Sequence, residues 1–189
     1  MPRFLSPRLK EFLDGEIPEK ITNPIELFIK SAESCVGIME EGGDNHGKMV
    51  EAFQATIGGA CGESWCLSFA QSMIAYVEDR LGVSCDLFLT EHCLTLWDKT
   101  PKDQKFKEPI PGDLVLWRYG ETTKGHVGIV LKNDFKVIEV CEGNTGPSGI
   151  VERNGDGVYK KIRAKIGTSN MHLLGYIRVN FSTENSSKQ

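Results

Sequence analysis

Cys66 follows a glycine-rich turn and opens a long apolar segment, which makes it the first candidate for chemistry in this sequence. The stretch Gly58–Cys66 reads GGACGESWC, and Ser64 is a plausible N-cap for a helix that begins just after it. In the first turn of a helix, unpaired backbone amides and the helix dipole favour an anion, so a thiolate at Cys66 would be stabilised and its pKa lowered. Cys66 is therefore a candidate nucleophile. The alternative is a small, buried apolar residue.

His126 is the matching candidate for a general base. It opens the predicted strand His126–Lys132, within the motif Gly125–Val130 (GHVGIV). Side chains alternate between the two faces of a strand, so His126, Gly128 and Val130 share one face. We expect the nearby glycines to leave open space beside the imidazole. A single histidine in a strand is otherwise a core or surface residue, and that alternative stays open here.

A third polar group is predicted to lie near the histidine. The segments His126–Lys132 and Phe135–Cys141 flank the turn Asn133–Asp134. If they form an antiparallel hairpin, the end of the second strand lies beside the start of the first. Glu142 or Asn144 would then orient the imidazole and stabilise its protonated form. The alternatives are a solvated charge for Glu142 and a turn residue for Asn144.

Helices are predicted throughout the first half of the chain. Asn23 and Pro24 supply an N-cap and a first-turn proline for an amphipathic helix that runs to about Ile38. The apolar spacing after Cys66 predicts a buried helix that ends near Gly82. Shorter helices are predicted at Pro7–Leu13, Met49–Ile57 and Glu91–Trp97.

Beyond Pro109 the sequence is rich in valine, isoleucine and aromatic residues separated by turn residues, which predicts strands. They are Gly112–Tyr119, His126–Lys132, Phe135–Cys141, Gly149–Arg153, Val158–Ile166 and Leu173–Phe181. Helices followed by an antiparallel sheet define an α+β fold. We expect an N-terminal arm at 1–23, one domain at 24–181 and a disordered polar tail at 182–189.

Composition limits the classes of function. The chain has 189 residues, of which 40% are hydrophobic, and this suits one domain with its own core. A net charge of -4 gives no electrostatic reason to expect binding to nucleic acid or to a membrane. We find no secretory signal or membrane-spanning segment. We therefore expect synthesis in the cytoplasm, with another route of exit for any work outside it.

Metal and disulfide sites find little support in the sequence. The six cysteines are widely spaced and include no Cys-x-x-Cys pair, so we expect mostly free thiols and no structural zinc site. The acidic loop Glu40–Asn45 offers oxygen ligands for calcium, but it lacks the spacing of an EF-hand, and a solvated turn is the alternative. We expect no metal and no cofactor.

Four motifs, in their order and separation, resemble the CHAP family of cysteine, histidine-dependent amidohydrolases/peptidases, within the papain-like and NlpC-type group. They are Ser64–Cys66, Pro111–Val115, Gly125–Val130 and Glu142–Thr145. The resemblance covers roughly Ile25 to Val179. It implies a papain-like fold, with N-terminal helices packed on a C-terminal antiparallel sheet, and makes 24–181 the catalytic domain.

The resemblance also implies a hydrolase that cuts an amide bond in peptidoglycan, as an amidase or an endopeptidase. Carried over by position, Cys66 is the nucleophile, His126 the base, Glu142 the third member and Asn144 an auxiliary polar residue. The backbone amide of Cys66 would form part of the oxyanion hole. We expect a monomer, similar to some phage lysis enzymes (endolysins), that acts on the cell wall after release.

The role of two tryptophans is not decided by the sequence, and two other classes of function are alternatives. Trp65 and Trp117 are candidates for lining the substrate groove, with core packing as the alternative. One rival function is a catalytically silent domain that binds the wall or a partner protein. Another is a protein-directed cysteine protease or acyl transferase on the same fold. Fold alone does not decide among these functions.

Overall fold

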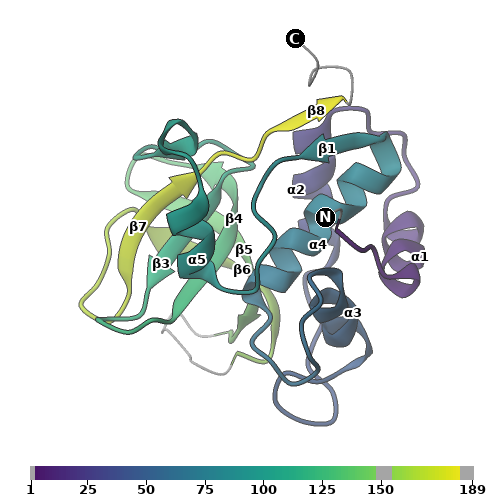
Figure 1. Ribbon diagram of the computed structural model, residues 1–189, viewed down its shortest axis with the longest axis horizontal. Coiled ribbons are helices and arrows are strands. Elements are labelled where there is room, and N and C mark those ends of the chain that lie inside the picture. Colours follow the sequence, from purple (N-terminus) through teal and green to yellow (C-terminus); the bar gives the residue numbers. More distant parts are fainter. Residues whose placement is uncertain (1–2, 148–154, 184–189) are drawn as a thin grey trace.

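The computed structural model describes residues 3–147 and 155–183. In this part of the chain, helices come first and antiparallel strands follow, which confirms the expected α+β fold. Figure 1 shows helices α1 to α4 gathered on one side of the molecule and strands β3 to β7 on the other, with α5 in front of the sheet. The predicted strand Gly149–Arg153 and tail residues 184–189 lie outside the described residues.

Helices form in the predicted segments, although the helix expected to run to about Ile38 ends at Ser34. Their bounds are Pro7–Glu16 for α1, Pro24–Ser34 for α2, Lys48–Thr56 for α3 and Cys93–Lys99 for α5. Asn23 caps α2 as expected, because its side chain accepts hydrogen bonds from the backbone N–H groups of Ile25 and Glu26, both at 3.0 Å.

The first helix contributes to the main core. Leu9 and Leu13 of α1, and Ile17 at its end, are fully buried. α1 contacts both α2 and α3. Among the helices of the described residues, none has the length and apolarity needed to cross a membrane.

α4 (Cys66–Leu81) is the central helix. Every residue from Cys66 to Val77 is buried, as expected for a helix enclosed on all sides. It packs on α2 and α3 and on strands β4 and β5. Gly82 ends it in the left-handed conformation, at the position that the sequence predicted. The predicted cap at Ser64 is wrong: Trp65 occupies the N-cap position, and its side chain makes no capping hydrogen bond.

The described strands form two sheets, in which all pairings are antiparallel. The larger sheet has the order β2-β7-β3-β4-β5-β6. Its strands are β2 Lys105–Phe106, β3 Leu114–Arg118, β4 Gly125–Asn133, β5 Val137–Thr145, β6 Gly157–Ala164 and β7 His172–Ile177. β1 (Val83–Cys85) and β8 (Phe181–Thr183) pair separately, so regular structure continues past residue 181.

β4 and β5 form the predicted hairpin, and the two faces of β4 contact different hydrophobic clusters. Val127 and Ile129 belong to the main core with α4, whereas Val130 belongs to a smaller cluster on the opposite face, as the alternation predicted. Trp117 of β3 belongs to the same smaller cluster and is the cross-strand partner of His126. The sheet therefore presents His126 on the face away from the main core.

Candidate active site

Cys66 is the first residue of α4, where free backbone amides can stabilise an anion. The residue before it, Trp65, is fully buried. Its indole stacks on Phe53 with ring centroids 5.7 Å apart, and its Nε1 donates a hydrogen bond to Oε1 of Glu40 at 2.8 Å. Side-chain packing around Trp65, rather than a polar cap, therefore fixes the start of α4 and the backbone of Cys66.

Asn144 holds the same segment from the sheet. It lies at an irregularity in β5 with a φ of 52°, in the left-handed region that asparagine tolerates better than most residues. The Asn144 side-chain amide is oriented so that both its oxygen and its nitrogen have hydrogen-bond partners. In this orientation the oxygen accepts a hydrogen bond from the backbone N–H of Trp65 at 2.9 Å. The nitrogen then donates to the carbonyl of Gly155 at 3.1 Å. Asn144 thus ties β5 to the residue that precedes Cys66.

His126 lies between Cys66 and Glu142. Its Nε2 is 2.9 Å from Oε2 of Glu142. The imidazole also interacts electrostatically with Cys66, and Nδ1 is the ring nitrogen that remains for this thiol. The imidazole stacks on Trp117 with ring centroids 6.0 Å apart, and Tyr119 lies at 6.3 Å. Cys66, His126 and Glu142 are all buried, and His126 is hydrogen-bonded to Glu142.

The glycines beside His126 make room for other residues, which differs from the open space that we expected. A Cβ at Gly128 would lie 3.0 Å from Cγ of Glu142, and a Cβ at Gly125 would lie 2.9 Å from Cβ of Cys93. Close-packed interiors do not accept such contacts without displacement of a neighbour. The two glycines thus allow Glu142 and Cys93 to approach β4.

Arg163, which nothing in the sequence singled out, neutralises Glu142. Its Nε donates to Oε1 at 2.7 Å and its Nη2 donates to Oε2 at 2.6 Å, a two-point contact. Arg163 pairs with Ile138 across β5 and β6, so it shares a face with Glu142. Its guanidinium also lies 5.8 Å from the ring centroid of Trp117. Because the Glu142 side chain is fully buried, these cationic partners are needed to offset the cost of burying its charge.

Charges along this chain favour an ion pair between Cys66 and His126. Hydrogen bonds from Cys93 and His126 lower the pKa of Cys66 well below that of a free thiol, although burial opposes this. Burial would lower the pKa of His126, but Cys66 and Glu142 raise it to about 9. Burial would raise the pKa of Glu142, but Arg163 and His126 lower it to about 2. These shifts all favour the thiolate of Cys66, the imidazolium of His126 and the carboxylate of Glu142.

Cys93 is a second thiol beside Cys66, and its sequence position gave no indication of this. It is the first residue of α5, and its Sγ lies 3.7 Å from Sγ of Cys66. Both thiols are free and buried. The hydrogen bond to Cys66, together with burial, raises the pKa of Cys93 well above its usual range. Cys93 therefore keeps its proton and donates a hydrogen bond to the Cys66 thiolate.

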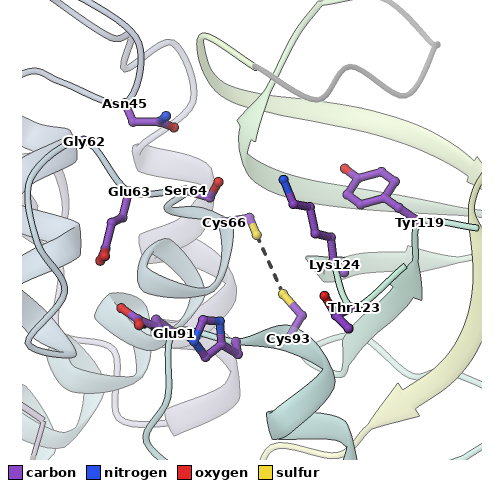
Figure 2. Close-up of a pocket in the computed structure, with 12 residues that line it drawn as sticks. Asn45, Gly62, Glu63, Ser64, Cys66, Glu91, Cys93, Tyr119, Thr123 and Lys124 are labelled. Carbon is purple, nitrogen blue, oxygen red and sulfur yellow. Dashed lines mark hydrogen bonds and ion pairs between the residues drawn. The ribbon is translucent and has the colours of Figure 1, made fainter. Parts of the chain in front are cut away.

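A cavity of about 710 Å³ opens onto the two thiols. This volume is within the range that is usual for ligand sites. Figure 2 shows the sulfurs of Cys66 and Cys93 facing each other, with Glu63 and Glu91 on one side of them and Lys124 on the other. The remaining residues that line the cavity are Asn45, Gly62, Ser64, His92, Tyr119, Thr123 and Gly125. The cavity gives a substrate access to Cys66.

Neither tryptophan proposed for the groove lines this cavity. Trp65 is 0% exposed and Trp117 is 3% exposed. The expectation that they contact substrate is therefore corrected: Trp65 packs in the main core, and Trp117 supports the ring of His126. Tyr119 is an aromatic residue that does line the cavity.

The acidic loop Glu40–Asn45 is tied to the rest of the structure by its first residues. Glu40 binds the indole of Trp65, and the N–H of Glu41 donates to the carbonyl of His46 at 2.9 Å. The His46 side chain is partly exposed and lies 3.6 Å from Glu51. Within residues 3–147 and 155–183, no three His, Cys, Asp or Glu side chains gather as a possible metal site. One carboxylate oxygen of the loop, on Glu40, thus accepts a hydrogen bond from Trp65, the residue before Cys66.

A cysteine at a helix start, a strand histidine and a buried carboxylate, on an α+β scaffold, form the arrangement of a cysteine-dependent hydrolase. The family model of the CHAP domain matches residues 58–144, from the turn before Cys66 to Asn144. This match supports the resemblance to the CHAP family found in the sequence. CHAP domains are generally cysteine- and histidine-dependent amidohydrolases or peptidases, and in general they act on peptidoglycan. No curated protein matches the chain at a significant level.

Proposed function

We propose that this protein hydrolyses an amide bond in peptidoglycan, with Cys66 as nucleophile, His126 as general acid and base, and Glu142 as the residue that orients His126. The observation that supports this proposal most strongly is the hydrogen-bonded series His126–Glu142–Arg163, together with Cys66, which lines the cavity and raises the pKa of His126. The CHAP domain supports peptidoglycan as the substrate class.

The proposed reaction passes through an acyl-enzyme. The Cys66 thiolate attacks the amide carbonyl carbon, the C–N bond breaks, and protonated His126 gives its proton to the leaving amine. The acyl group then remains on Sγ as a thioester. Neutral His126 takes a proton from water, which attacks the thioester and releases a carboxylic acid with the Cys66 thiolate. The backbone N–H of Cys66, at the start of α4, is a candidate donor to the oxyanion.

The direct test is the release of amino groups from the wall. Hydrolysis of each amide bond frees one amine and one carboxyl group, so purified peptidoglycan incubated with the protein should gain amino groups in proportion to time and protein concentration. Fragment masses then distinguish an amidase, which separates peptide from glycan, from an endopeptidase, which cuts within the peptide. If walls of several peptide chemistries gain no amino groups, peptidoglycan hydrolysis is excluded as the activity.

The alkaline limit of activity should report the protonation of His126. The leaving amine needs the imidazolium, which persists up to the pKa of about 9. We therefore expect kcat/KM to stay high at neutral pH and to fall above about pH 9, by roughly tenfold per pH unit, as the acid form is lost. A pH series of initial rates measures this. A fall that begins near the usual histidine pKa of about 6.5 would contradict the ion pair.

Arg163→Met should lower activity and move the alkaline limit upward. The substitution removes both hydrogen bonds that hold the Glu142 carboxylate. Misplacement of Glu142 and His126 should reduce kcat by roughly 10- to 100-fold. With the nearby cation gone, the Glu142 charge acts more strongly on His126, so the pKa of His126 should rise. Arg163→Lys, which restores the charge but not the two-point contact, should recover part of kcat.

A second arginine–carboxylate pair, between the residue before β3 and the residue after β7, provides the control. Arg178 binds Asp113 through two bonds, at 3.0 and 3.1 Å, and its guanidinium lies over the ring of Phe106. Arg178→Met therefore removes a similar contact to a buried carboxylate, but outside the site. We expect it to lower the melting temperature without moving the pH limit. If both variants lose activity equally, Arg163 has a structural role only.

A further inference from the structure

We propose that Cys66 and Cys93 form an oxidation site, in which a peroxide oxidises Cys66 and Cys93 then joins it in a disulfide. The proposal rests on the reactive Cys66 of the proposed function and adds to it a modification that blocks the nucleophile reversibly. The main evidence is the position of Cys93 beside Cys66, because Cys93 is not a reacting group in the proposed hydrolysis.

The geometry brings the two sulfurs together in an accessible place. Their separation of 3.7 Å is close to van der Waals contact, and both residues line the same cavity. Figure 2 shows the two side chains pointing toward each other, from the start of α4 and the start of α5. A disulfide requires a sulfur separation of about 2.05 Å, so the sulfurs must approach by roughly 1.7 Å. Because α5 has seven residues and follows the irregular segment 86–92, its start is the part suited to make this movement.

The other cysteines have different surroundings. Cys35, Cys85 and Cys141 are buried, and burial raises the pKa of each thiol, so they stay protonated and unreactive. Cys61 is exposed, and it is not among the residues that line the cavity. Cys66 is a buried thiol that combines a lowered pKa with access from the cavity, and Cys93 is its sulfur neighbour.

The chemistry needs a peroxide as oxidant and proceeds in two balanced steps. In the first step the Cys66 thiolate attacks one peroxide oxygen, an S–O bond forms as the O–O bond breaks, and the departing hydroxide takes a proton from His126 to become water. The sulfur is oxidised by two electrons and the peroxide is reduced. In the second step the Cys93 sulfur attacks the sulfenic sulfur of Cys66. The S–S bond forms, the S–O bond breaks, and hydroxide leaves with the Cys93 proton as a second water.

Cys93 should also protect Cys66 from irreversible damage. A sulfenic acid without a neighbouring thiol reacts with further peroxide to give sulfinic and sulfonic acids, which thiol reductants do not reverse. Disulfide formation competes with this pathway because the second sulfur is already in contact. We therefore expect the wild-type protein to lose activity in peroxide and to regain it with dithiothreitol.

The test treats the full chain with hydrogen peroxide and compares wild type, Cys93→Ser, Cys93→Ala and Cys61→Ser. Peptide mapping under non-reducing conditions should find a Cys66–Cys93 disulfide in wild type and in Cys61→Ser. In both Cys93 variants it should find sulfinic or sulfonic acid at Cys66. After dithiothreitol, wild type and Cys61→Ser should regain most of their own initial activity, and the Cys93 variants should regain almost none of what they lost.

The peptide map decides the proposal independently of catalysis, because it needs no hydrolase activity. Absence of a Cys66–Cys93 disulfide in oxidised wild type would overturn it, as would recovery of the Cys93 variants to the wild-type level. Melting curves of the unoxidised variants show whether both Cys93 variants are folded. If one is unfolded, the other and the wild-type map still decide. A disulfide in a protein that never releases amino groups would support the oxidation site and reject the hydrolase.

Discussion

Cys66→Ala should reduce the release of amino groups from peptidoglycan by about 10,000-fold or more, because the nucleophile acts as a unit with its base and its loss removes the acyl-enzyme pathway. The fold should persist, because alanine is small and suits the first turn of α4. Initial rates of amine release measure the effect, and a melting curve monitors the fold. Cys66→Ser should also be severely impaired, because the serine hydroxyl is not ionised at neutral pH.

Cys61→Ala is the matched control for this variant. Cys61 lies five positions before Cys66, in the same glycine-rich turn, but it is exposed and does not line the cavity. We expect it to retain full activity. Full activity in Cys66→Ala would reject the thiol mechanism, and equal losses in both variants would indicate damage to the turn rather than to the chemistry.

The second large effect is expected at His126 and Glu142, in a fixed order. His126→Ala removes both the acid and the base, so we expect a loss of about 10,000-fold. Glu142→Gln keeps the imidazole and a hydrogen-bonding group beside it, so we expect a smaller loss of roughly 100- to 1,000-fold. Because Glu142 helps to raise the pKa of His126 to about 9, its neutralisation should move the alkaline limit of kcat/KM to lower pH.

These variants can be separated from simple destabilisation. Glu139→Gln, on the same strand, breaks a pair between Glu139 and the exposed Lys132, and we expect it to change neither rate nor pH limit. The direction of the pH shift adds a second check, since Glu142→Gln should lower the limit and Arg163→Met should raise it. Equal losses in Glu142→Gln and His126→Ala, with no pH shift, would argue against an orienting role for Glu142.

The sequence predicted the main positions of the candidate site because they depend on local patterns. The helix after Cys66 follows from apolar spacing and its end at Gly82, and the β4–β5 hairpin follows from two apolar segments around a turn. The hairpin alone left Glu142 and Asn144 as alternatives. Which of the two faces His126 depends on the irregular pairing of β5 and β6. This irregularity gives Asn144 a positive φ and directs its side chain to Trp65. No local pattern revealed that irregularity.

Arg163 and Cys93 could not be predicted because long-range packing places them. Arg163 reaches Glu142 from β6, 21 positions along the chain, and its residue type is ordinary for an exposed strand position. Cys93 meets Cys66 because α5 packs near the start of α4, and the lack of a side chain on Gly125 permits the approach. In both cases the sequence supplied the residue but not the partner.

The short strands and the two tryptophans show the same limit. β1 has three residues and β2 has two, and each forms only because a distant strand pairs with it. Trp65 and Trp117 fit either a groove or a core by type. The burial of both side chains shows that they pack in the interior, and the stacking of Trp65 on Phe53 accounts for its place beside Cys66.

Mass spectrometry of purified peptidoglycan, after incubation with wild-type protein and with Cys66→Ala, tests the central claim most directly. The account predicts defined wall fragments with new amino and carboxyl ends from the wild type and none from the variant, and the fragment masses would name the bond. Fragments from both proteins would contradict the role of Cys66. Fragments from neither, across several wall types, would contradict peptidoglycan hydrolysis and favour a binding domain or a protein substrate.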